Sequence, residues 1–335
     1  MPSFSRHRLS REPVPVLIFG LLLNAGCALY PQTHSLLDTQ PDNLPPRGRI
    51  EGVPFFPQTD YQCGPSALAT VLTFYGQSAT PETLSHRIYV PGRKGSLQVE
   101  IVSAARQFGF AVYPLDPSLA QILSEIEAGH PVLVMQNLGL SWLPQWHYAT
   151  VIGFDLGEKD VILHSGGDEA LPLSLTTFER TWEGGAYWGI VISPPAVIPA
   201  TATPDRYLQS LEDLVITGQE TAARDGYLAA RKRWPHHPRV AFGQGNLAYR
   251  MGDYPQAVES LKAATTMNPD DAASWNNLAY ALAQTGSADA LDALDKALQL
   301  GGNRPEIQSS VKDIERLLNQ SSKPARNALG DTPVR

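Results

Sequence analysis

The spacing of apolar positions divides the chain into three parts. Between residues 63 and 128 apolar side chains recur every three to four residues, which predicts helices at 63–76, 81–89, 97–108 and 118–128. A brief strand at 112–113 and short apolar runs at 131–136, 147–154, 160–164 and 187–192 predict strands. From residue 204 the helical period returns. This order indicates an α+β domain, with helices packed on an antiparallel sheet, followed by an all-α domain.

The C-terminal part repeats itself every 34 residues. Gly218, Gly252 and Gly286 are spaced by that interval, and so are Pro235 and Pro269. This is the period and pattern of tetratricopeptide repeats, which form a solenoid that commonly binds a peptide or a protein partner. We predict three repeats over 204–304 (204–237, 238–271 and 272–304), a capping helix over 305–320 and a disordered tail over 321–335.

The N-terminus has the features of an export signal. A basic start is followed by the apolar run Val14–Leu23, which is too short to span a bilayer but suits a signal-peptide core. Residues 1–26 are therefore predicted to be a signal peptide, and small residues before Cys27 resemble a bacterial lipoprotein signal in which that cysteine is lipidated. Ala28 resembles the outer-membrane class, so we expect a lipid anchor in the cell envelope, facing the periplasm. Ordinary cleavage nearby and an uncleaved anchor are the alternatives. The polar residues that follow show no periodicity and predict a lipidated tether over 27–49 between the membrane and the domain.

Charge and cysteine content narrow the function. The formal net charge is −7, and the first 26 residues carry +2, so the remainder carries −9. An acidic body argues against nucleic acid as a partner. The two cysteines, Cys27 and Cys63, each have an individual explanation, although a disulfide between them is possible. We expect no cofactor. We also expect no metal site, because the adjacent His236 and His237 have no further ligand residues around them.

One stretch carries candidate chemistry. Cys63 comes at the start of a predicted helix, with Pro65 in the first turn and Gly76 as a stop. Unpaired backbone N–H groups and the helix dipole at this position favour the thiolate, which is the nucleophilic form. Gln58, five residues upstream, is placed to donate to an oxyanion. The alternative is a small buried cysteine that merely opens a core helix.

A histidine at the mouth of a strand supplies the second group. His147 opens the strand 147–154 directly after the aromatic loop 141–146. Alone it would be a structural residue, but together with Cys63 it predicts a thiolate–imidazolium pair. The three segments Gln58-x4-Cys63-Gly-Pro-Ser-Ala, 128–134 (Ala-Gly-His-Pro-Val-Leu-Val) and 147–155 (His-Tyr-Ala-Thr-Val-Ile-Gly-Phe-Asp) resemble papain-like cysteine peptidases related to the double-glycine leader peptidases of bacteriocin exporters.

The resemblance covers about residues 50–196 and implies roles for individual residues. Gln58 corresponds to the oxyanion donor, Cys63 to the nucleophile and His147 to the general acid and base. The family's third residue, an Asp or Asn followed by Pro at the end of the next strand, is replaced here by Ser165 and Gly166. Three possibilities stay open: Ser165 orients the imidazole, a nearby residue such as Asp168 or His164 does so, or the site is weakened. A hairpin turning at Gly157 would set Asp168 opposite His147.

These features predict an exported, lipid-anchored thiol peptidase that cleaves a peptide or protein, joined by a proline-rich linker over 197–203 to repeats that bind a protein. A catalytically weak or inactive peptide-binding scaffold of the envelope is the alternative. Acyl transfer or deamidation by the same Cys–His pair is a third, chemically close option, because all pass through a thioester. The chain has no phosphate-binding loop of an exporter, so the substrate class of these relatives is not carried over.

Overall fold

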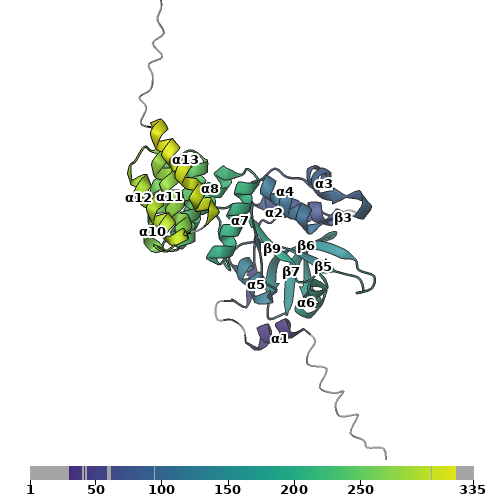
Figure 1. Ribbon diagram of the computed structural model, residues 1–335. Helices are drawn as coiled ribbons and strands as arrows, with labels where there is room; N and C mark the ends of the chain where they lie inside the picture. Colours follow the sequence, from purple (N-terminus) through teal and green to yellow (C-terminus); the bar gives the residue numbers. More distant parts are fainter. Residues whose placement is uncertain are drawn as a thin grey trace, which may run out of the picture.

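The computed structural model describes residues 30–39, 41, 44–58, 62–93, 95–302 and 304–321. The predicted signal peptide, Cys27 and the tail beyond residue 321 lie outside the described residues. Within them, a sheet with helices on both faces is followed by an array of helices (Figure 1). Among the described residues no helix has the length and apolar character needed to cross a membrane.

The centre of the first part is a seven-stranded sheet in which every pairing is antiparallel. Six strands run in the spatial order β4-β9-β5-β6-β7-β8, and β1 pairs with the far end of β6. The strands are β1 (Arg47–Arg49), β4 (Ala111–Pro114), β5 (Val132–Asn137), β6 (Trp146–Asp155), β7 (Asp160–Ser165), β8 (Asp168–Ser174) and β9 (Gly189–Ser193). A separate two-stranded sheet pairs β2 (Tyr89–Val90) with β3 (Gly95–Ser96).

Each face of the large sheet has its own core. Along β5, Leu133 packs into the core of one face, whereas Val132 and Val134 pack into the core of the other, as the alternation of side chains along a strand requires. The first face is covered by α2 (Cys63–Phe74), α3 (Pro81–Ile88) and α4 (Gln98–Gln107). The second is covered by α1 (Pro31–Asp38), α5 (Leu119–Glu127) and α6 (Leu175–Gly184). The predicted α+β class, with helices on an antiparallel sheet, is confirmed.

The prediction of a tether without regular structure over 27–49 is wrong for the residues that the structure describes. Pro31–Asp38 is a helix, and Arg47–Arg49 is a strand paired with β6. The carboxylate of Glu179, which is buried in α6, accepts the backbone N–H groups of Gln32 at 2.9 Å and Thr33 at 2.7 Å. An anion at a helix N-terminus satisfies donors that would otherwise have no partner. The docking of α1 on α6 is a long-range contact that the local composition does not reveal.

Six helices follow in pairs, two to each predicted repeat. They are α7 (Pro204–Ile216), α8 (Glu220–Arg233), α9 (Pro238–Arg250), α10 (Tyr254–Met267), α11 (Ala272–Gln284) and α12 (Asp289–Gly301), and α13 (Pro305–Ser321) covers the end. Ala223, Ala257 and Ala290, which recur in the sequence pattern, are completely buried. A Cβ atom on Gly245 would lie 2.6 Å from Leu261 Cγ on the paired helix. Small residues therefore occupy the positions where the helices touch, as the repeat pattern predicts.

The proline-rich linker predicted over 197–203 is held against the α+β domain. The buried Glu125 accepts hydrogen bonds from the backbone N–H groups of Ala200 at 3.0 Å and Thr201 at 2.7 Å and from the Thr201 hydroxyl at 2.5 Å, and it also contacts His130 Nδ1 at 2.6 Å. Beyond the segment, Ser210 on α7 donates to the carbonyl of Val112 in β4 at 2.9 Å. One core cluster runs from the sheet into α7 and α8, so the first repeat is packed onto the α+β domain.

Candidate active site

The N-terminus of α2 holds the candidate nucleophile. Cys63 is the first residue of the helix, and Gln62 before it makes no side-chain cap. The thiol is free and half-buried. The next residue, Gly64, faces β3, where a Cβ atom would lie 2.7 Å from both Cβ and Oγ of Ser96. A glycine therefore allows the start of the helix to press against this strand, which fixes the position of Cys63.

The thiol of Cys63 lies against the backbone of β6. Burial raises the pKa of Cys63, while hydrogen bonds from the backbone of Tyr148, Gly64 and Cys63 itself act in the opposite direction. The sequence led us to expect that the helix N-terminus would favour the thiolate. The backbone donors do lower the pKa, but removing the anion from water costs more. The net effect is a pKa of Cys63 above the ordinary value of a cysteine thiol.

His147, the second residue of β6, is oriented by a hydroxyl group. Its Nε2 atom lies 2.9 Å from Oγ of Ser165 at the end of β7. Burial lowers the pKa of His147, because the imidazolium loses hydration and gains no carboxylate. Among the described residues no hydrogen bond joins the ring to Cys63, although Cys63 contacts the backbone of Tyr148, the residue after His147. The predicted thiolate–imidazolium pair stays a prediction.

The structure distinguishes the three candidates for the orienting role. Ser165 contacts the ring, and it does so at Nε2. Asp168 pairs with Ser165 across a tight turn and is exposed, so the expected register that sets it opposite His147 is wrong. His164 is buried in other contacts: its Nε2 lies 3.1 Å from the carbonyl of Val53, and its Nδ1 accepts the N–H of Ala170 at 3.2 Å.

Gln58 is attached to the same two strands. Its backbone N–H donates to the carbonyl of Gly166 at 2.9 Å, beside Ser165. Its side-chain Nε2 donates to the carbonyl of Tyr148 at 3.3 Å, while Oε1 is buried without a hydrogen-bond partner in the structure as described. The four predicted site residues, drawn from positions 58 to 165, are thus gathered around the start of β6 and the end of β7.

Two residues that the sequence analysis did not assign hold this arrangement together. The backbone of Tyr148 forms hydrogen bonds with both Cys63 and Gln58. Its buried hydroxyl donates to the carbonyl of Ser96 at 3.2 Å. Gly64 permits the contact of α2 with β3. An aromatic residue immediately after the candidate histidine, and a glycine immediately after the cysteine, are the sequence signals that could have pointed to them.

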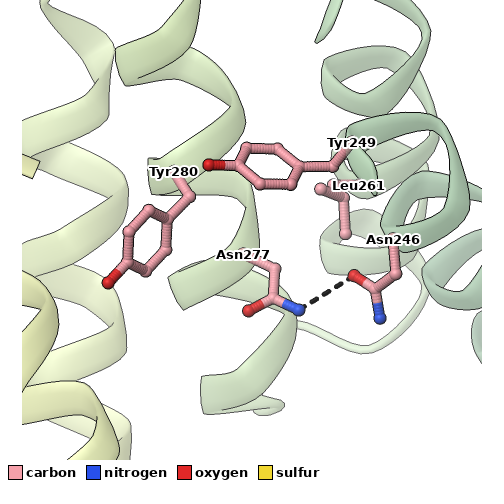
Figure 2. Close-up of a pocket in the computed structure, with 5 residues that line it drawn as sticks. All are labelled: Asn246, Tyr249, Leu261, Asn277 and Tyr280. Carbon is pink, nitrogen blue, oxygen red and sulfur yellow. Dashed lines mark hydrogen bonds between the residues drawn. The ribbon is translucent and has the colours of Figure 1, made fainter. Parts of the chain in front are cut away.

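The repeats contain a separate cavity. Figure 2 shows Asn246 of α9 and Asn277 of α11 side by side, with Nδ2 of Asn277 donating to Oδ1 of Asn246 at 2.8 Å. Tyr249, Tyr280 and Leu261 complete the lining of about 280 Å³. In the part of the chain that the structure describes, no group of three or more His, Cys, Asp or Glu residues is arranged to hold a metal ion.

Comparison with known proteins identifies both parts. Residues 50–186 match the Peptidase_C39 like family, and residues 242–305 match a tetratricopeptide-repeat family. The peroxisomal targeting signal receptor of Candida albicans is 42% identical over 166 residues, which are 45% of this chain but only 26% of that protein.

Two solved structures show a low similarity to this chain. A C39-like peptidase from Bacillus anthracis is 16% identical with a TM-score of 0.37, covering 44% of this chain and 96% of its own. The peptidase domain of Streptococcus ComA, a bi-functional ABC transporter, is 23% identical with a TM-score of 0.36, covering 42% of this chain and 98% of its own. The two family matches show that the chain carries a Peptidase_C39-like domain followed by tetratricopeptide repeats.

Proposed function

We propose that this protein is an exported, lipid-anchored cysteine peptidase, in which Cys63 is the nucleophile, His147 the general acid and base, Gln58 an oxyanion donor and Ser165 the residue that positions the imidazole. The observation that carries the proposal is the convergence of these four residues around one backbone segment. Cys63 and Gln58 both contact the backbone of Tyr148, and His147, the preceding residue, contacts Ser165.

The geometry supports a defined sequence of proton transfers. When Nε2–H of His147 donates to Ser165, Nδ1 carries a lone pair and can accept the thiol proton as Sγ of Cys63 attacks a peptide carbonyl carbon. The oxyanion that forms receives the backbone N–H of Cys63 and the second N–H of the Gln58 amide. The C–N bond breaks, the amine leaves with the proton from His147, and a thioester remains. Water, deprotonated by His147, then releases the carboxylic acid and restores the thiol.

The resting state differs from that of an ion-paired thiol peptidase. The pKa of Cys63 is raised and that of His147 is lowered, both by burial. Both shifts favour the neutral thiol and neutral imidazole near pH 7. Ser165 adds no charge that would stabilise an imidazolium. We therefore infer that His147 removes the proton during attack, as a general base, rather than holding a thiolate beforehand.

The repeats are the proposed site for a protein partner. Tetratricopeptide repeats commonly bind proteins or peptides through their concave surface. The cavity between α9 and α11 offers two amides and two tyrosines around an apolar floor (Figure 2). Because the first repeat is packed onto the α+β domain, a partner held here would have a fixed orientation relative to Cys63.

The proposed anchor follows from the sequence before residue 30. A lipid on Cys27 would hold the protein at the outer membrane, facing the periplasm. Since α1 begins at Pro31, only residues 28–30 would separate the lipid from the folded body, or about 10 Å of extended chain.

The first test is the rate of Cys63 alkylation by iodoacetamide from pH 5 to 10, in the wild type and in His147→Ala, using a chain that begins at residue 28. All contacts described above lie within residues 30–321, so this chain keeps the folded body. The companion assay is cleavage of a library of proteome-derived peptides by the same proteins. We expect the wild type to cleave, Cys63→Ala to lose cleavage, and His147→Ala to cleave at least about a hundredfold more slowly. Absence of cleavage together with alkylation that does not depend on His147 would refute the catalytic proposal.

A second candidate is a peptide-binding scaffold without catalysis. The observation that favours it is Ser165, a neutral residue at the position where the related peptidases carry Asp or Asn. In that case Cys63→Ala would retain the peptides or proteins captured by the wild type with unchanged affinity, and no cleavage product would form.

A further inference from the structure

Exposed apolar side chains are concentrated at one site on this molecule. Of the eleven large hydrophobic residues that are exposed in the part of the chain the structure describes, four lie on the turn between β5 and β6, and a fifth is the first residue of β6. We call this segment, residues 138–146, the apolar hairpin. Its exposed residues are Leu138, Leu140, Trp142, Leu143 and Trp146, with Trp142 76% and Leu143 63% exposed. A cluster of this kind on a soluble surface marks an interaction site.

Hydrogen bonds hold these side chains in the exposed position. The backbone N–H groups of Leu140 and Leu143 donate to each other's carbonyl oxygen at 3.1 and 3.0 Å. Oδ1 of Asn137 accepts the N–H groups of Gly139 at 3.0 Å and Gln145 at 2.9 Å. The tip therefore has an ordered turn of its own and does not fold back onto the sheet.

The charge pattern indicates what the apolar hairpin contacts. No Asp, Glu, Lys or Arg occurs between Pro131 and Phe154, although the body after residue 26 carries a net charge of −9. Tryptophan beside leucine, without charge, is the composition that inserts at the boundary between lipid headgroups and acyl chains. A peptide side chain would instead require a concave subsite, and side chains that are half to three-quarters exposed do not enclose one.

The position of the apolar hairpin relative to the N-terminus points the same way. Helix α6 connects them: the carboxylate of Glu179 holds the first turn of α1. At the C-terminal end of the same helix, a Cβ atom on Gly184 would lie 2.9 Å from Cβ of Asn137, at the base of the hairpin. Five residues of helix separate Glu179 from Gly184, a rise of about 8 Å. Figure 1 shows α1 and α6 close together and the hairpin projecting away from the repeats.

The proposed lipid anchor indicates that the contact surface is a membrane, and this step rests on the proposed function. A lipid on Cys27 would hold residue 30, directly before α1, beside the bilayer. We propose that the apolar hairpin inserts into the interfacial region of a lipid bilayer and forms a second membrane contact beside the N-terminus. Trp142 and His147 are five residues apart, at most about 17 Å of strand, so insertion would hold the candidate active site close to the membrane surface.

The test is sedimentation with zwitterionic phosphatidylcholine vesicles, using the chain that begins at residue 28. That chain lacks Cys27, so the result does not depend on lipidation, and it does not require peptidase activity. We expect the wild type to partition onto the vesicles in 0.1 M and in 0.5 M NaCl alike, because the hairpin carries no charge to screen. The variant Trp142→Ser/Leu143→Ser should lower the partition coefficient by at least about tenfold.

Ile216→Ser is the matched control, because Ile216 is 78% exposed but lies at the end of α7. It should partition as the wild type does, and unchanged Cys63 alkylation will show that each variant is folded. A wild-type chain that stays in the supernatant overturns the proposal, and so does equal partitioning of the double variant. If the double variant binds vesicles normally but cleaves the peptide library poorly, the hairpin contacts substrate instead.

Discussion

Replacing Ser165 with aspartate tests how the imidazole is controlled. The Ser165 Oγ atom lies 2.9 Å from Nε2 of His147, so a carboxylate in this position would contact the ring directly. We expect Ser165→Asp to raise the pKa of His147 and to convert part of the neutral Cys–His pair into an ion pair. The reactive thiolate would then exist at lower pH than in the wild type.

The magnitude follows from Coulomb's law with two opposing corrections. Opposite charges about 4 Å apart attract by about 4 kcal/mol at an effective dielectric constant near 20, which corresponds to about 3 pKa units. Burial of the new carboxylate opposes this gain. Asp168, paired with Ser165 across the turn, also repels the new carboxylate, but it is exposed and therefore screened. A net rise of about 1 to 2 units remains, within the range seen for such pairs.

The assay is the rate of Cys63 alkylation between pH 4 and 10. The ratio of ion pair to neutral pair changes tenfold for each unit by which the pKa of His147 rises, so the Ser165→Asp variant should react at least about tenfold faster at pH 6. Ser165→Asn is the control, because it keeps a hydrogen-bonding group without the charge. If the Asp and Asn variants have the same pH profile, the charge at this position does not control the thiol, and our reasoning is refuted.

Three further predictions concern packing, stability and location. Gly64→Ala places a Cβ atom 2.7 Å from Ser96, so it should cost about 1–3 kcal/mol in urea unfolding and slow Cys63 alkylation; Ser96→Gly in the same chain should restore both, and failure to do so would contradict the contact. Glu125→Gln should cost about 2–4 kcal/mol. Burial alone would raise the pKa of Glu125, but hydrogen bonds from His130, Thr201 and Ala200 hold it below its usual value. The stability that the Glu125 carboxylate contributes is therefore present above about pH 4.3 and is lost as the pH falls through the lower folded-state pKa. A stability difference between Glu125→Gln and the wild type that does not shrink below pH 4 would argue against this role. Cys27→Ala removes the proposed lipid and should lower the membrane-bound fraction of the full-length protein, leaving only the weaker binding by the apolar hairpin. Unchanged partitioning into the detergent phase would refute lipidation.

The sequence by itself determined the elements whose signals are local. Helix α2 begins at Cys63 and α3 begins at Pro81, both as predicted, and the side chain of the α3 N-cap, Thr80, accepts the N–H of Thr83 at 3.3 Å. The β6–β7 hairpin and the pairs of helices in the repeats also follow the predicted pattern. Apolar period, capping residues and the 34-residue interval act over a few residues or recur regularly, so one sequence is enough to reveal them.

Elements with weak local signals were missed. Strand β8 is a partly exposed edge strand that contains Pro172, and proline is tolerated there because one side of an edge strand needs no ladder hydrogen bond. Helix α6 does carry a recognisable pattern: Ser174 is its N-cap, and Leu175, Phe178 and Trp182 form a buried face. That signal was available in the sequence and could have been used.

Only the tertiary structure decided how distant segments meet. The ring nitrogen that contacts Ser165, the exposed position of Asp168 and the burial of His164 depend on strand register, which shifts at irregularities in both β6–β7 and β7–β8. The docking of α1 on Glu179 and of residues 200–201 on Glu125 joins segments 75 to 147 positions apart. Burial raises the pKa of Cys63, against the expectation from the helix terminus, and lowers that of His147. Desolvation depends on everything packed around a group and not on its neighbours in sequence.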